Sequence, residues 1–160
     1  VRKATPAGHM TVHHKDRDCM MIASLLSGNL NAYRLSRGLP QLVFNEQLEL
    51  SSLYHCKRIK ELREFEHTLS DGVELEARVK KYGYRFSEVR ENLYFLEDPR
   101  LSLTELAEQM HQGWIASPGH HANMISATEE VGIGVVRRGN RFWAVQNFGT
   151  PRRHRVPQLL

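Results

Sequence analysis

His120 lies where a helix is expected to begin. It follows Ser117-Pro118-Gly119, and a serine N-cap followed by proline is typical of a helix start. In the first helical turn, the positive end of the helix dipole disfavours an imidazolium ion. The neutral imidazole is the form that binds a metal ion or accepts a proton. His120 is therefore a candidate ligand or base, although a histidine that only packs at a helix start would give the same pattern.

His67 and Glu91 are two further candidates for chemistry. His67 follows a long predicted helix and precedes a turn-forming segment at residues 68–72, and such loops often carry functional side chains. Glu91 lies in a predicted strand, where a carboxylate is disfavoured and is costly if it is buried without a partner. It either forms an ion pair with an arginine such as Arg78 or faces the two histidines.

No local motif assigns a reaction to these residues. The sequence contains no His-Glu-x-x-His, no Cys-x-x-Cys, no Gly-x-Ser-x-Gly and no phosphate-binding glycine-rich loop. His55 and His111 fall on predicted helices, where a surface or partly buried histidine is more common than a ligand. Four other histidines lie in the terminal segments and are expected to be solvated: His9, His13, His14 and His154.

Hydrophobic periodicity and capping residues predict the elements that position the candidates. Helices are expected over residues 20–36, 45–62, 71–82 and 102–114 and briefly from residue 117, and strands over residues 88–95, 131–136 and 141–148. Asn45 is a good N-cap, and Ser102 opens a capping box. Asp71 and Glu74 have the same capping-box spacing, and Gly83 is placed to end that helix.

The last two predicted strands form a hairpin with its turn at Gly139-Asn140. Gly132 and Gly134 alternate with apolar residues in the first of these strands, and glycine inside a strand often marks the close approach of another backbone or a ligand. The order of helices, strand, helices and hairpin predicts an α+β sandwich. Its helices would cover an antiparallel or mixed sheet rather than a doubly wound parallel one.

The composition is that of one ordinary globular domain. The chain has 160 residues, of which 41% are hydrophobic and 25% charged, and no apolar run approaches the roughly 20 residues that span a bilayer. The formal net charge is +4, with the basic excess at the two ends, so nucleic-acid binding is not expected. Residues 1–18 are expected to be a tail or tag-derived, residues 19–150 the domain, and residues 151–160 a basic tail.

Cys19 and Cys56 are the two cysteines of the chain. Two cysteines cannot form the dense disulfide framework of small secreted proteins. They could form one bridge that pins the N-terminal segment to a later helix, or they could be two buried thiols. The sequence leaves both alternatives open.

An ordered set of motifs resembles the CAP superfamily, which comprises cysteine-rich secretory proteins, antigen 5 and pathogenesis-related proteins. The sequence is most similar to the bacterial SCP-like branch of this superfamily. The resemblance spans about residues 22–150. The motifs are Phe65-x-His67-Thr68, Arg78 before Gly83-Tyr84, Glu91-Asn92, Trp114-x-x-Ser117-Pro118-Gly119-His120, Val131-Gly132-Ile133-Gly134 and Trp143-x-Val145-Gln146-Asn147-Phe148-Gly149.

This resemblance implies a three-layer α-β-α sandwich with a central, mainly antiparallel sheet. It also implies a cleft with two histidines and two acidic residues, which in some members binds zinc or another divalent cation. His67 and His120 match the histidines, and Glu91 matches one of the acids. Arg90 replaces the family's usual glycine beside that acid, and Ser117 stands at the second acidic position, as is common in bacterial members. Glu130 is a candidate substitute, so Arg90, Ser117 and Glu130 are expected to line the cleft.

The resemblance further implies a monomeric, secreted or cell-envelope protein. A binding domain that holds a divalent cation, and with it a small molecule, lipid or peptide-like ligand, is the first hypothesis. The second is an interaction protein that binds a protein partner and has a vestigial cleft, which the arginine at position 90 and the missing second acid favour. The third is a metal-dependent hydrolase with Glu91 as general base.

Overall fold

The computed structural model describes residues 13–97 and 100–153. Five helices and four strands are described in these ranges. Their bounds are α1 (Arg17–Ser36), β1 (Val43–Phe44), α2 (Glu46–Leu62), α3 (Leu75–Lys81), β2 (Phe86–Glu97), α4 (Leu103–Ala116), α5 (Pro118–Met124), β3 (Glu130–Arg138) and β4 (Arg141–Pro151).

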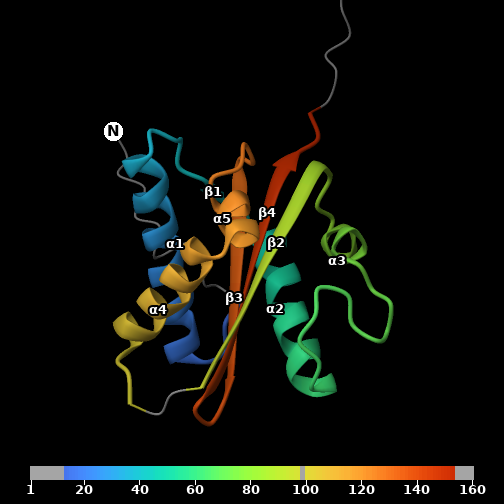
Figure 1. Cartoon of the computed structure of the whole chain (residues 1–160). Coiled ribbons are helices and arrows are strands. Elements are labelled where there is room, and N and C mark those ends of the chain that lie inside the picture. The colour runs from blue at the N-terminus through green and yellow to red at the C-terminus, as the bar shows by residue number, and fades with distance from the viewer. Residues whose placement is uncertain (1–12, 98–99, 154–160) are drawn as a thin grey trace, which may run out of the picture.

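The sheet has the strand order β1-β3-β4-β2 and forms the middle layer (Figure 1). β4 pairs antiparallel with both β2 and β3, and only the two-residue β1 runs parallel to its neighbour β3. Helices α1 and α4 cover one face and α2 covers the other, with α3 beside it. The predicted α+β class and three-layer sandwich are therefore confirmed. None of the helices in the described ranges is both long and apolar enough to cross a membrane.

Side-chain caps set the start of several helices. The Asn45 side chain accepts a hydrogen bond from the Leu48 N–H (2.9 Å), and the Ser102 hydroxyl accepts one from the Glu105 N–H (3.2 Å), as expected from the sequence. The prediction that Asp71 begins a helix is wrong. Its carboxylate accepts from the Val73 N–H two residues on (3.0 Å), which forms a local turn, and α3 begins only at Leu75.

The strand glycines mark the place where α2 lies directly on β3. A Cβ atom at Gly132 would come within 2.0 Å of the Glu49 backbone nitrogen, and one at Gly134 within 2.6 Å of the Leu53 nitrogen. The Ser52 hydroxyl donates to the Gly132 carbonyl (2.9 Å) across this contact. The predicted close approach of another backbone is therefore confirmed, and it sets the position of α2 over the sheet.

The expectation of a solvated histidine at position 14 is wrong. The His14 side chain is buried between α2 and β3, where its Nε2 accepts a hydrogen bond from the Val135 N–H (3.1 Å). Its Nδ1 lies 3.9 Å from the buried Glu49 carboxylate. Burial lowers the pKa of His14 to about 4 and raises the pKa of Glu49 to about 8. Both shifts favour the uncharged forms of the two groups. The segment before α1 therefore packs on the domain.

The start of α1 differs from the prediction, and both cysteines are free thiols. Helix α1 begins at Arg17, earlier than predicted, because the Asp16 side chain accepts from the Asp18 and Cys19 N–H groups. Cys19 and Cys56 are both buried and free, so the alternative of two thiols holds. The expectations for residues 1–12 and 154–160 lie outside the described residues.

We expect Gly132→Ala to destabilise the fold by roughly 3 kcal/mol, because the added methyl group meets the α2 backbone and forces the layers apart. Gly28→Ala is the matched control. Nothing lies within 4 Å of its added Cβ in α1, and alanine favours a helix over glycine by roughly 0.5–1 kcal/mol. Chemical denaturation of both variants measures the difference, and equal stability of the two would contradict the close contact.

Candidate functional site

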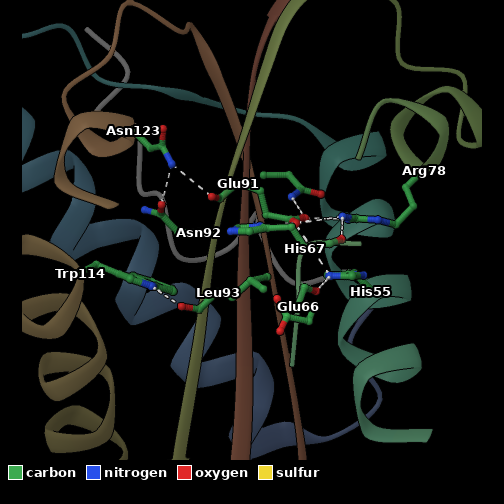
Figure 2. Close-up of polar contacts among 10 residues, drawn as sticks. His55, Glu66, His67, Arg78, Glu91, Asn92, Leu93, Trp114 and Asn123 are labelled. Atoms are coloured by element: carbon green, nitrogen blue, oxygen red, sulfur yellow. Dashed lines mark hydrogen bonds and ion pairs between the residues drawn. The ribbon is translucent and has the colours of Figure 1, made fainter. Parts of the chain in front are cut away.

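Glu91 is the centre of a buried polar cluster on β2 (Figure 2). Only 6% of this residue is exposed. Arg78 of α3 donates to both carboxylate oxygens, from Nη1 to Oε2 (2.6 Å) and from Nη2 to Oε1 (2.9 Å). Asn147 of β4 donates from Nδ2 to Oε2 (2.7 Å), and His67 Nδ1 lies 3.0 Å from Oε1. The alternative of an ion pair with Arg78 is therefore confirmed, and of the two candidate histidines the carboxylate contacts His67.

Two buried side chains hold the loop that carries His67. Arg78, which is 1% exposed, donates from Nη2 to the main-chain oxygen of His67 (3.2 Å). His55 of α2 contacts the main-chain oxygen of Glu66 through Nε2 (2.9 Å), and the same nitrogen lies 3.8 Å from Glu91. Figure 2 shows these contacts converging from α2, α3 and β2. The backbone on both sides of the His67 Cα is thereby fixed.

His55 and Asn147 are members of this cluster that the sequence analysis did not assign to it. His55 was expected to be a surface or satisfied histidine, and it is indeed satisfied, but by the loop that positions His67. A signal was present, since His55 falls next to Cys56 on the buried stripe of α2. Asn147 gave no local signal. It reaches Glu91 because the two residues are direct partners in the β2–β4 register.

The cluster sets the charge of its members. Burial alone would raise the pKa of Glu91, but the hydrogen bonds from His67 and Arg78 and the charge of Arg78 lower it from 4.5 to about 2. The hydrogen bond to Glu91 raises the pKa of His67. The glutamate is therefore ionised at neutral pH. Its carboxylate also accepts a hydrogen bond from the Nδ1–H of His67. Nε2 of the half-exposed imidazole is then the ring nitrogen that can accept a hydrogen bond.

His120 reaches the same region from the other face of the sheet. Asn92 follows Glu91 on β2 and points to the opposite face, where its Nδ2 donates to the main-chain oxygen of His120 (3.2 Å). Asn123 of α5 donates from Nδ2 to the Glu91 main-chain oxygen (3.1 Å) and to Asn92 Oδ1 (2.8 Å). Because β2 is an edge strand, α5 and the His67 loop can approach each other past it.

Two effects lower the pKa of His120. Burial is the larger effect, and the charge of His67 is the second. This direction agrees with the expected neutral imidazole, although burial is the main cause. The Nδ1 atom of His120 is buried and has no hydrogen-bond partner in the described part of the chain. His67 and His120 therefore form an asymmetric pair, the first favouring the proton and the second the neutral form.

The three residues expected to line the cleft have different surroundings. Ser117 is the N-cap residue of α5, but its hydroxyl makes no capping hydrogen bond. Arg90 points to the face opposite Glu91 and pairs with Glu88, so it does not crowd the Glu91 carboxylate. Glu130 accepts a hydrogen bond from the Tyr84 hydroxyl (2.8 Å). That these residues contact a ligand stays a prediction.

The donor atoms for a metal ion are few. Among residues 13–97 and 100–153, no group of three or more His, Cys, Asp and Glu side chains is arranged to hold a metal ion. Both oxygens of Glu91 are already hydrogen-bonded, so this carboxylate supports His67 instead of offering a free ligand atom. The chemistry of the donor set fits at most a two-histidine site completed by water or by a bound ligand.

A model of the cysteine-rich secretory protein family, CAP, matches residues 28–148, well over half of the chain. The chain belongs to the CAP family. The match includes His67, Glu91 and His120, so the polar cluster lies within the family's domain. A search of curated proteins gives no match.

Several solved CAP structures share the fold. An outer surface protein from Borrelia burgdorferi has a TM-score of 0.70 and 23% identity, over 82% of this chain and 93% of that one. An extracellular SCP-domain protein from Bacillus anthracis has a TM-score of 0.66 and 23% identity, over 83% of this chain and 40% of that one. The structure of NaASP2 with Zn²⁺ has a TM-score of 0.53 and 12% identity, over 85% of each chain.

We expect Glu91→Ala to destabilise the domain by roughly 3–5 kcal/mol, because it leaves the buried Arg78 guanidinium without its carboxylate. Thermal and chemical unfolding measure the loss. Glu88→Ala on the same strand removes only a half-exposed ion pair and should cost less than about 1 kcal/mol. Stability equal to that of the wild type in Glu91→Ala would contradict a structural role for the cluster.

The pKa of Glu91 also predicts how stability depends on pH. The folded-state value is depressed, so the stabilisation is fully present above about pH 4.5 and is lost as the pH falls toward about 2. The free energy of unfolding of the wild type should therefore decrease across this window. Glu91→Gln, which cannot ionise, should show a shallower decrease when both proteins are measured by denaturation at matched ionic strength. Parallel curves would contradict the assignment.

Proposed function

We propose that this CAP domain is an extracellular binding domain whose cleft between His67 and His120 takes up a divalent cation such as Zn²⁺, together with a small ligand. The observation that carries the proposal is the hydrogen bond between Glu91 and His67 Nδ1 (3.0 Å), which directs the ring's other nitrogen away from the carboxylate. A carboxylate that holds one nitrogen of a histidine in this way is the usual partner of a metal-binding imidazole.

His120 supports the proposal from the other side of β2. Its lowered pKa favours the neutral imidazole that a cation requires, and its buried Nδ1 is an unused polar group. Two imidazoles make a weak and open site, in which water or a bound ligand would complete the coordination. The extracellular and outer-surface CAP proteins that share this fold support the proposed location, and NaASP2 with Zn²⁺ is a CAP structure in which the cation is present.

Binding is favoured over hydrolysis by the state of Glu91. A general base needs a free carboxylate oxygen, whereas both Glu91 oxygens accept hydrogen bonds and the lowered pKa makes the group a weak base. The Ser117 hydroxyl has no base as a hydrogen-bond partner among the described residues. The proposal therefore assigns ligand retention, and not turnover, to the cleft.

Isothermal titration with Zn²⁺ tests the site. Loss of a residue that only supports a metal ligand costs roughly 10–100-fold in affinity. The His67→Ala/His120→Ala double variant removes both nitrogen ligands, so its affinity for Zn²⁺ should fall by more than this. His121→Ala is the control, because His121 lies on the same helix but its Nε2 pairs with the Tyr33 hydroxyl (2.7 Å). Equal Zn²⁺ binding by the wild type and the folded double variant would show that the cation binds elsewhere.

Cation binding should strengthen as the pH rises. Because the hydrogen bond to Glu91 raises the pKa of His67, a proton competes more strongly with the cation at this imidazole as the pH falls. Titrations at about pH 6 and about pH 8 should therefore show tighter binding at the higher pH. In His67→Ala this part of the pH dependence should disappear, and a wild-type affinity that does not change with pH would contradict His67 as a ligand.

A further inference from the structure

A concave site lies away from the polar cluster. Its lining residues come from the end of α2, the end of β2 and the tip of the β3–β4 hairpin, which lie at the same end of the sheet (Figure 1). Its cavity measures about 410 Å³, which is within the usual range for small-molecule sites. Phe65, Phe95 and Trp143 form its apolar wall, with the Phe95 ring centroid 6.4 Å from that of Phe65 and 5.5 Å from that of Trp143. Such a wall suits a flat apolar body.

Positive charge surrounds this aromatic wall. Lys60, Arg63, Arg138 and Arg141 line the cavity, and Glu64 is the one acidic residue that does so. The Glu64 carboxylate is already used, since it accepts a hydrogen bond from the Ser70 N–H (2.7 Å). The cavity therefore carries an excess of cationic side chains over a surface rich in exposed aromatic rings.

Three of these four cations form no ion pair with an acidic residue in the described ranges, and Arg141 is the exception. Lys60 donates to the Arg137 main-chain oxygen (3.3 Å), and Arg141 lies 3.6 Å from the Glu97 carboxylate. Arg63 and Arg138 make no ion pair within the described part of the chain. Guanidinium groups offer paired N–H donors that match the oxygens of carboxylate, sulfonate or phosphate groups.

The backbone at Arg63 is a second, independent observation. Arg63 ends α2 in the left-handed conformation (φ 56°, ψ 35°), and it is the one residue other than glycine with positive φ among those described. Glycine is the usual residue there because a side chain is strained in this region. A strained arginine at the rim of a cationic aromatic cavity indicates that its side chain contributes something that glycine would not.

We infer that this cavity binds a small organic anion that has a flat apolar body, with the body against Phe65, Phe95 and Trp143 and the anionic group at Arg63 and Arg138. The site goes beyond the proposed cation cleft and does not depend on it, although one loop supplies both Phe65 and His67. The opposite signs of the two proposed ligands, a cation at His67 and an anion here, make the sites separable by experiment.

The test uses 8-anilinonaphthalene-1-sulfonate as an anionic aromatic probe and N-phenyl-1-naphthylamine as its neutral counterpart. We expect saturable binding of the sulfonate at one site, weaker binding of the neutral probe, and a shift of the Trp143 indole N–H signal by NMR, while the buried Trp114 signal stays in place. Arg63→Gly/Arg138→Gln should weaken sulfonate binding about tenfold or more. Arg63→Gly relieves the backbone strain, so this variant should stay folded with an unchanged or higher Tm.

The control variant Arg17→Gln/Arg37→Gln removes the same charge from the two ends of α1 and should bind the sulfonate as the wild type does. His67→Ala/His120→Ala should also keep sulfonate binding, so failure of the cation site and failure of this one are distinguishable. The inference is overturned if the sulfonate does not saturate, if both probes bind equally, if the Trp143 signal does not move, or if the cavity and control variants lose the same affinity.

Discussion

The buried ion pair between Arg78 and Glu91 is the interaction on which the candidate site depends. Two charges removed from water are costly unless they meet in good geometry and their remaining polar atoms are satisfied. Here Arg78 contacts both carboxylate oxygens, and Asn147 and His67 occupy further positions around them. The same guanidinium holds the His67 main chain, so one ion pair joins α3, the edge strand and the His67 loop.

This arrangement changes the part that the glutamate can play. A carboxylate with every oxygen engaged is a poor ligand and a weak base, but it fixes the tautomer and the direction of an imidazole. The result is a pair of histidines with opposite pKa shifts, His67 raised by its hydrogen bond to Glu91 and His120 lowered first by burial. A pair of this kind suits retention of a ligand better than proton transfer at a reacting group.

The edge strand β2 explains how residues from opposite faces of the sheet can serve one region. Glu91 and Asn92 are neighbours in sequence, and strand geometry points them to opposite faces. One secures the His67 loop beside α2 and α3, and the other secures α5 with His120. The same strand continues to Phe95 in the aromatic cavity, so β2 links the polar cluster to that cavity.

The sequence by itself determined the local features: the N-caps Asn45 and Ser102 and the hairpin turn each follow from interactions within a few residues. It also predicted that another backbone or a ligand comes close to Gly132, although only the packed fold showed that α2 does so. Through family motifs it placed His67, Glu91 and His120 as candidates. The sequence offered Arg78 and the histidines as alternative partners of Glu91. Only the tertiary structure decided that Arg78, His67 and Asn147, which lie 13, 24 and 56 residues away in the chain, contact it together. The burial of His14 against Glu49 and the assembly of the aromatic cavity were likewise decided only by the tertiary structure. Local patterns report on neighbours in sequence, whereas these contacts depend on the packing of helices across a sheet, which no short segment encodes.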